Sequence, residues 1–189
     1  MGINSLVVKP SRALLLGERV EVHFERLLSL PIPHYIETSP MFDRILVLCT
    51  GNICRSPMAE ILLRHHLGVA GARTEVQSAG TGALVDHGAD TSAVSLMQDR
   101  GLDLTAHRAR QVTRELTRWA DVILVMEGHH RDELSDTDPA ARGKAFLLGH
   151  WIGQEIPDPY KRGEDEWAVA LQLIDEGVAS WVGKIALHR

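Results

Sequence analysis

Apolar runs alternate along the chain with segments whose apolar residues recur every three or four positions. The first run, at 43–49, predicts a buried strand, and the helical spacing of residues 57–68 predicts the helix that follows it. The same alternation predicts strands at 73–78, 120–126 and 144–148 and helices at 90–100, 113–119, 128–134 and 165–187. Strands that alternate with helices favour an α/β fold, here a doubly wound four-stranded parallel sheet with helices on both faces.

The first 41 residues do not share this pattern. They show no clear period, and three prolines between residues 29 and 40 favour an extended linker. We therefore expect an N-terminal extension at 1–41 and one folded domain at 42–189, a length that permits a real core. Met41 leaves two interpretations open: the extension is a loose tail added by an upstream start, or it is a docking segment.

The turn between the first strand and the first helix carries the candidate chemistry, and Pro57 after it suits the first turn of a helix. The residues of this turn are Cys49, Thr50, Gly51, Asn52, Ile53, Cys54, Arg55 and Ser56. Where a loop joins a strand to a helix, backbone N–H groups converge on an anion at the helix N-terminus. Gly51 allows close approach of the backbone, and Asn52 tolerates a left-handed conformation. The sequence therefore predicts a phosphate-binding loop directly after the first strand.

Cys49 and Arg55 make this loop a nucleophilic site. A thiol at a helix N-terminus and near an arginine is favoured as the reactive thiolate. The planar guanidinium of Arg55 fits two oxygens of a phosphate. The loop differs from a nucleotide-binding P-loop, because it has no lysine in the place where that motif needs one. It is therefore expected to bind a tetrahedral oxyanion and to place a thiolate beneath it.

A second motif, Asp158-Pro159-Tyr160, lies far along the chain, after the last predicted strand. In this order, the two motifs resemble the signature of the low-molecular-weight protein tyrosine phosphatases, and the resemblance runs from about Phe42 to the C-terminus. The segments 78–84, 149–151 and 156–161 are similar to the bacterial branch of that family, which is encoded with exopolysaccharide tyrosine kinases.

The resemblance implies a protein-tyrosine-phosphatase that hydrolyses phosphotyrosine through a cysteinyl-phosphate intermediate. Cys49 would attack phosphorus, Arg55 would clamp the phosphate, and Asp158 would act first as general acid and then as general base. Substrate and phosphate binding would fall to Thr50, Gly51, Asn52, Ile53, Cys54, Ser56 and Tyr160.

Several of these residues have a second interpretation. By resemblance, Ser78 and His107 would support Asn52 from outside the loop, although each is also common as an ordinary loop residue. Ser56 either donates its hydroxyl to the thiolate or caps the helix, and the two roles are compatible. Tyr160 would form an aromatic wall beside the phosphotyrosine ring or would pack against the domain.

Composition narrows the class of partner. The net charge of −5 gives no reason to expect nucleic acid or an anionic membrane as a partner. No apolar run approaches the roughly 20 residues that span a bilayer. The two cysteines, Cys49 and Cys54, both lie in the loop, which excludes a disulfide framework and favours the reducing cytoplasm. We expect a monomer, and the resemblance implies a phosphotyrosine protein as partner, a bacterial tyrosine kinase of capsule or exopolysaccharide assembly.

The ten histidines raise the question of metal binding, but their spacing fits no standard zinc pattern. Adjacent histidines on a helix, such as His129 and His130, point about 100° apart and do not share one metal easily. The thiolate mechanism needs no metal, so we expect neither a metal nor another cofactor.

Two other functions use the same loop. An arsenate reductase of this fold needs further cysteines to relay oxidation, and no cysteine follows Cys54. A non-catalytic phosphotyrosine-binding module would be expected to lack Cys49, Arg55 or Asp158, and all three are present. A reversible disulfide between Cys49 and Cys54 is a separate, regulatory option that the sequence leaves open.

Overall fold

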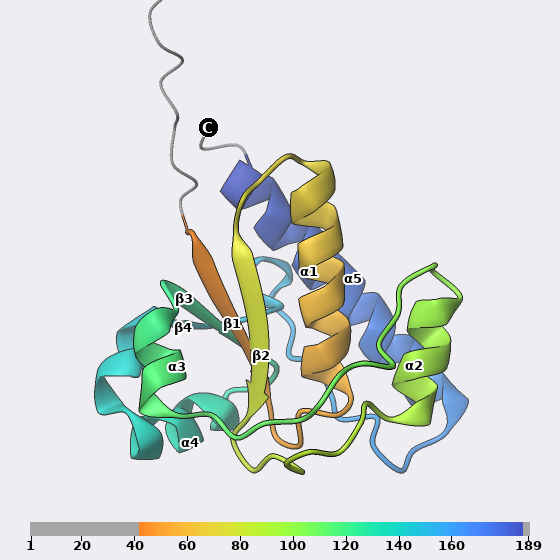
Figure 1. The fold of residues 1–189 in the computed structure, drawn as a ribbon, viewed down its shortest axis with the longest axis horizontal. Helices are drawn as coiled ribbons and strands as arrows, with labels where there is room; N and C mark the ends of the chain where they lie inside the picture. The colour runs from red at the N-terminus through yellow and green to blue at the C-terminus, as the bar shows by residue number, and fades with distance from the viewer. Residues whose placement is uncertain (1–41, 187–189) are drawn as a thin grey trace, which may run out of the picture. The chain divides into compact units, whose positions relative to one another are not determined.

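The computed structural model describes residues 42–186, so the expectations for residues 1–41 lie outside the described part of the chain. Four strands form one parallel sheet in the order β2-β1-β3-β4 (Figure 1). Their bounds are β1 Arg44–Cys49, β2 Glu75–Gly80, β3 Val122–Val125 and β4 Ala145–Leu147. The prediction of an α/β fold with a four-stranded parallel sheet is confirmed.

Within residues 42–186, the helices fall where the apolar spacing predicted them. The α-helices are α1 Arg55–Val69, α2 Thr91–Gln98, α3 Arg114–Trp119, α4 His129–Thr137 and α5 Glu164–Ala186. Two short 3-10 helices, η2 Pro139–Lys144 and η3 His150–Ile152, border β4. None of the helices in this part of the chain has the length and apolar character needed to cross a membrane.

Among the element boundaries that differ from the prediction, those of α1 and β2 lie next to the loop. Helix α1 begins at Arg55 and not at Pro57, so the arginine of the loop is already the first helical residue. Strand β2 begins and ends later than predicted and runs on to Gly80, because Gly80 pairs with Cys49 at the end of the β1–β2 ladder. The loop between β1 and α1 is therefore shorter than predicted, and the end of β2 lies directly beside Cys49.

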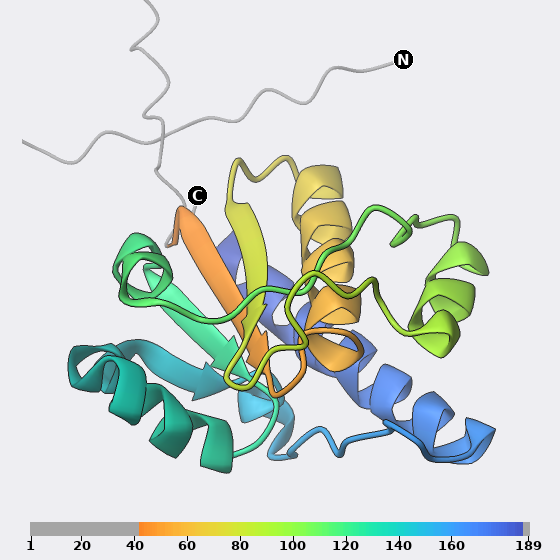
Figure 2. The same ribbon diagram turned by 60° about the horizontal axis from the view of Figure 1, so that its bottom comes forward.

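The helices cover both faces of the sheet. Helices α1 and α5 lie side by side on one face, and α3 and α4 lie on the other (Figures 1 and 2). In β1, Ile45 and Val47 belong to the core beneath α1 and α5, whereas Leu46 and Leu48 belong to the core on the opposite face. Burial on both faces explains why β1 appears in the sequence as one continuous apolar run.

The carboxyl ends of the parallel strands meet at one edge of the sheet, at the bottom of Figure 1, and Figure 2 brings this edge forward. Cys49 ends β1 beside Gly80, which ends β2. The N–H of Ile156 donates to the Met126 carbonyl at 2.9 Å, which holds the segment before α5 against the end of β3. Residues that are distant in the sequence therefore share one crevice, as is usual for a doubly wound sheet.

Candidate active site

The loop between β1 and α1 turns its carbonyl groups toward the rest of the domain. The carbonyl oxygens of residues 49–53 accept hydrogen bonds from the N–H groups of Thr81, Gly82, Leu84 and Asp90 and from the His107 ring. The N–H groups of residues 51–54 donate to no other group within residues 42–186. With its carbonyls bonded outward and its N–H groups free, the loop is suited to bind an anion.

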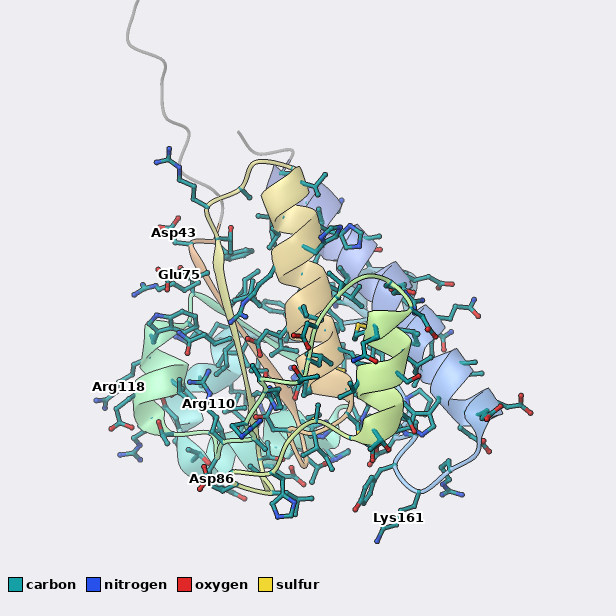
Figure 3. All side chains as sticks on the ribbon, turned by 45° about the vertical axis from the view of Figure 1, so that its right-hand side comes forward. Asp43, Glu75, Asp86, Arg110, Arg118 and Lys161 are labelled. Carbon is teal, nitrogen blue, oxygen red and sulfur yellow. The ribbon has the colours of Figure 1, made fainter. Side chains whose placement is uncertain are left out.

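Asn52 holds the loop in this conformation. Its backbone is left-handed, with φ at 54°, and the residue is completely buried. Its amide nitrogen donates to the hydroxyls of Ser56 and Ser78, each at 2.9 Å, and its amide oxygen accepts from the Arg110 N–H at 3.0 Å. The His107 Nε2 contacts the Asn52 carbonyl oxygen at 2.7 Å. The segment that carries Arg110 runs beside the loop (Figure 3).

Gly80 allows the end of β2 to touch the loop. A Cβ atom at Gly80 would lie 2.3 Å from the Thr50 carbonyl oxygen, which no side chain tolerates. The backbone of Gly80 also forms a bridge with Gln111, whose side chain bonds to the Thr81 carbonyl and the Ala83 N–H at 2.7 and 2.9 Å. The close approach of two backbones therefore requires glycine here.

Cys49 lies at the floor of the loop and is only 2% exposed. Its Sγ atom is 2.9 Å from the Ser56 hydroxyl. Because that hydroxyl oxygen accepts from Asn52, its hydrogen is available to donate to the sulfur when Cys49 is a thiolate. The expectation that Ser56 also caps α1 is wrong: the N-cap residue is Cys54, no side chain caps the helix, and Ser56 lies inside the first turn.

Arg55 reaches across the site with a guanidinium that is 2% exposed. Its Nη1 atom pairs with the Glu127 carboxylate and donates to the Ile156 carbonyl at 2.8 Å, and its Nη2 lies 3.2 Å from Asp158 Oδ2. Its Nε is buried and has no hydrogen-bond partner within residues 42–186. A buried donor without a partner is costly, and an oxyanion in the loop would supply the acceptor.

A cavity of about 180 Å³ opens onto Cys49. Asp158 stands at its edge with 47% of its side chain exposed, and its Oδ1 accepts the Tyr160 N–H at 3.3 Å. Lys161 places its ammonium 5.1 Å from the centre of the Tyr160 ring, at the outer tip of the same loop (Figure 3). The cavity is lined by Cys49, Thr50, Gly51, Ile53, Cys54, Arg55, Gly82, Leu84, Asp158 and Tyr160. Two of these residues, Leu84 and Tyr160, are partly exposed.

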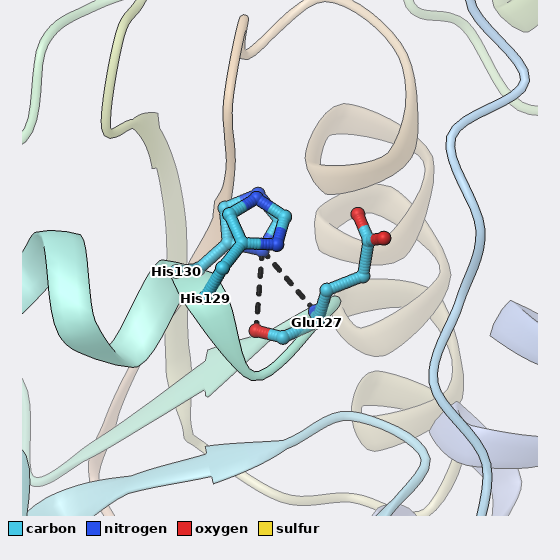
Figure 4. A group of neighbouring side chains, drawn as sticks. All are labelled: Glu127, His129 and His130. Atoms are coloured by element: carbon cyan, nitrogen blue, oxygen red, sulfur yellow. Dashed lines mark hydrogen bonds between the residues drawn. The ribbon is translucent and has the colours of Figure 1, made fainter.

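A completely buried histidine supports one side of the loop. His130 Nε2 lies 3.1 Å from the Thr50 hydroxyl. Its Nδ1 lies 3.2 Å from the Glu127 N–H and 3.3 Å from the Glu127 carbonyl oxygen (Figure 4). Burial, together with the charges of His129 and Arg55, lowers the pKa of His130 to about 4. The imidazole is therefore neutral at pH 7 and serves as a hydrogen-bonding group.

Glu127, His129 and His130 bring three potential metal ligands together, with ligand atoms within 4.8 Å of one another. The expectation that the two adjacent histidines diverge is wrong: their rings lie 4.0 Å apart and 32° from parallel, because side-chain rotation turns them toward each other (Figure 4). However, both ring nitrogens of His130 and the Glu127 carboxylate already bond to protein groups. The group fits a hydrogen-bonded support for the loop and does not fit a metal site.

Cys54 is the second buried cysteine of the loop, and both cysteines are free. Burial, followed by the charge of Asp90, raises the pKa of the Cys54 thiol. Cys54 therefore stays protonated at neutral pH, although it lies in the same loop as Cys49.

Three residues at the site were not identified from the sequence: Glu127, His130 and Arg110. Glu127 follows the apolar run of β3, so its place near the carboxyl end of a parallel strand was a usable signal. Nothing comparable marks His130, because its role arises from a contact between residues 80 positions apart. Arg110 contributes a backbone N–H, which carries no sequence signal at all.

Comparison with known proteins places this site in a family. The family model for low molecular weight phosphotyrosine protein phosphatase matches residues 44–189. The low molecular weight protein-tyrosine-phosphatase Wzb of Escherichia coli K12 is 46% identical over 143 residues, which are 75% of this chain and 94% of that protein.

Two solved structures agree with this match. The tyrosine phosphatase Wzb from Escherichia coli K30, in complex with sulphate, aligns with a TM-score of 0.72 at 46% identity and covers 76% of this chain and 99% of its own. Vibrio vulnificus Wzb, in complex with benzylphosphonate, aligns with a TM-score of 0.72 at 40% identity and the same two coverages, 76% and 99%. The family match, the identity to the Wzb phosphatases and the shared fold show that this chain belongs to the low molecular weight phosphotyrosine protein phosphatases and is a protein-tyrosine-phosphatase of the Wzb type.

Proposed function

We propose that this chain hydrolyses phosphotyrosine in two steps, through a phosphoryl group carried by Cys49. The observation that supports the proposal most strongly is the set of unpaired donors around the Cys49 sulfur. The free N–H groups of Gly51, Ile53 and Cys54 and the unpartnered Nε of Arg55 belong to residues that line one cavity with Cys49. Such donors match the three equatorial oxygens of a phosphoryl group during transfer.

In the first step, the Cys49 thiolate forms a bond to phosphorus while the bond from phosphorus to the phenolic oxygen breaks. The Ser56 hydroxyl, 2.9 Å from the sulfur, stabilises the thiolate before attack. Arg55 and the loop N–H groups hold the oxygens as charge moves onto them. Interactions that strengthen in the transition state increase kcat and not only affinity.

Asp158 supplies the proton for the leaving phenolate and then takes a proton from the water that displaces Cys49 and releases phosphate. Its carboxylate stands at the cavity edge, 3.2 Å from Arg55 Nη2. Pro157 and Pro159 restrict the backbone on either side of it. Because Glu127 and the Ile156 carbonyl hold Nη1, Arg55 keeps its orientation when Asp158 is protonated.

The proposed substrate is an aryl phosphate presented by a protein. Leu84 and Tyr160 offer apolar surface at the mouth of the cavity for a phenyl ring. The ligand of the Vibrio relative, benzylphosphonate, likewise joins a benzyl ring to a tetrahedral anion. We propose as substrate a bacterial tyrosine autokinase of exopolysaccharide or capsule assembly, and as location the cytoplasm, where both cysteines stay reduced.

The test is hydrolysis of an aryl phosphate in the presence of a chelator, with wild type, Cys49→Ser and Asp158→Asn. We expect Cys49→Ser to lose at least about 10³-fold in kcat and Asp158→Asn to lose about 10²-fold or more, the usual size of a general-acid contribution. The matched control is Asp165→Asn, which removes an exposed carboxylate from the neighbouring α5 and should keep kcat.

A wild-type protein that binds phosphate but hydrolyses no aryl phosphate under reducing conditions would overturn the proposal. Equal losses in Asp158→Asn and Asp165→Asn would remove Asp158 from the mechanism. The protein substrate is tested with an autophosphorylated tyrosine kinase of this class, for which we expect loss of phosphotyrosine with wild type and none with Cys49→Ser.

A further inference from the structure

We infer that His130 is a positioning residue that joins the two halves of the phosphate-binding site, the loop and the Arg55 clamp, through the hydrogen bonds of one neutral imidazole. The inference rests on the proposed roles of the loop and Arg55. His130 is completely buried, although no step of the proposed chemistry uses it. Its ring bonds to Thr50, in the loop, and to the backbone of Glu127, whose carboxylate binds Arg55. Figure 4 shows the contacts with Glu127.

Both ring nitrogens of His130 bond to the site. Nδ1 lies 3.2 Å from the Glu127 N–H and 3.3 Å from the Glu127 carbonyl oxygen, so it accepts from the first when unprotonated and donates to the second when protonated. Nε2 lies 3.1 Å from the Thr50 hydroxyl, which accepts in the first case and donates in the second. The ring thus makes one bond as an acceptor and one as a donor, in opposite directions.

Each of these hydrogen bonds links His130 to one part of the anion site, either the loop or the residue that pairs with Arg55. Thr50 directly follows Cys49, and its backbone carbonyl is held from the other side by the Gly82 N–H at 3.1 Å. The Glu127 backbone that bonds to Nδ1 carries the carboxylate that pairs with Arg55 Nη1. Movement of the ring would therefore displace the loop and the guanidinium together.

Burial and the positive charges near His130 favour the neutral ring. The ring faces His129 and Glu133 on α4, Arg55 on α1 and Glu127 at the end of β3; His129 and Arg55 oppose a second proton, whereas Glu127 and Glu133 favour one. The neutral ring bonds to Thr50 and to Glu127 in either tautomer.

Two substitutions separate the two bonds. His130→Asn places an amide group near the position of Nδ1 and keeps a hydrogen-bonding group for Glu127, but it no longer reaches Thr50. His130→Gln places an amide group near the position of Nε2 and keeps a hydrogen-bonding group for Thr50, but it loses the bond to Glu127. Thr50→Val removes the hydroxyl with almost no change of shape. His129→Gln is the control, because His129 is an exposed neighbour on the same helix.

The experiment measures kcat/KM for an aryl phosphate and competitive inhibition by inorganic phosphate. We expect Thr50→Val, His130→Asn and His130→Gln each to lose about tenfold in both quantities, the effect of one neutral hydrogen bond. Adding Thr50→Val to His130→Asn should cost nothing more, because that bond is already lost. Adding it to His130→Gln should cost a further factor of about ten.

The inference is overturned if Thr50→Val behaves like His129→Gln, or if Thr50→Val has the same effect in both histidine backgrounds. If the histidine variants fail to fold, Thr50→Val alone decides, since it leaves the core intact. A failure of the proposed function looks different: wild type and Cys49→Ser would then be equally inactive, whatever residue stands at position 130.

Discussion

At the scale of single residues, Asn52 connects the loop to several other parts of the domain. Its side chain bonds to Ser56, Ser78 and the Arg110 N–H, and its backbone has a φ of 54°, which few residues adopt without strain. The hydrogen bonds and the backbone conformation are separate contributions. A pair of substitutions can distinguish them.

We expect Asn52→Gly and Asn52→Ala both to lower kcat/KM by about 10²-fold, because three buried polar groups lose their partner. Asn52→Ala should also be less stable than Asn52→Gly by roughly 1 kcal/mol, because alanine is strained at positive φ. Aryl phosphate kinetics and urea unfolding measure the two effects. Equal stability of the variants would show that the backbone strain is absent, and unchanged kinetics would remove Asn52 from the support of the loop.

His130 gives stability a predictable pH dependence. Its pKa is about 4 in the folded protein and about 6.5 in the unfolded chain, so the folded state binds fewer protons between these values. The stability contributed by the neutral ring is therefore complete above pH 6.5 and is lost as the pH falls toward 4, with an upper bound of roughly 3 kcal/mol.

The measurement is the free energy of unfolding in urea from pH 7 to pH 4.5 for wild type and His130→Asn. Carboxylates titrate in both proteins, so the difference between the two curves isolates the histidine. We expect the difference to shrink as the pH falls. Parallel curves would mean that the ring is not held neutral in the folded protein.

At the scale of elements, the strands and helices were predictable because each buries one or both faces, and burial leaves a period in the sequence. The exact junctions were not predictable. Pro57 is typical of a helix start, but α1 begins at Arg55, since the loop backbone already enters the helical conformation there. β2 continues through Gly80, which resembles a turn residue in isolation, because the ladder to Cys49 extends that far.

The same distinction separates the site residues that could be predicted from those that could not. Cys49 and Arg55 lie within one short turn, so their chemistry is local and visible in the sequence. Glu127 and His130 reach the loop only through the fold of the sheet, across contacts of 72 and 80 positions. A single sequence has no period or motif that marks such contacts.

The junction of β2 with the loop provides a test at this scale. Gly80→Ala should lower kcat/KM by about tenfold or more, because its Cβ would lie 2.3 Å from the Thr50 carbonyl oxygen and must push the loop away. Gly88→Ala is the control, since a Cβ there meets nothing within 4 Å. The measurement is kcat/KM for an aryl phosphate, compared between Gly80→Ala and Gly88→Ala. Equal activity would show that the loop tolerates displacement by β2.

At the scale of the whole molecule, the site exists because one edge of the sheet collects loops from the entire domain. Cys49 ends β1, Gly80 ends β2, Glu127 follows β3, and Asp158 lies between η3 and α5. A chain with a net charge of −5 can thus offer an anion site through local donors. All of these residues lie within the family match at 44–189.

A chain that begins at Met41 should therefore keep kcat/KM for an aryl phosphate within about twofold of the full chain, since every proposed catalytic residue is retained. Activity toward an autophosphorylated kinase is measured alongside. A loss confined to the kinase would show that residues 1–41 dock the substrate protein. A loss with both substrates would contradict the placement of the domain at 42–189.

The central claim is that the phosphoryl group passes through Cys49. The most direct test is acid quenching of the enzyme during turnover of an aryl phosphate, followed by mass analysis of the peptide that contains residues 49–55. We predict that this peptide carries one phosphoryl group on Cys49 and that the adduct forms in a burst before steady-state release of phosphate. Steady hydrolysis without any adduct, together with activity that survives Cys49→Ser, would contradict the account.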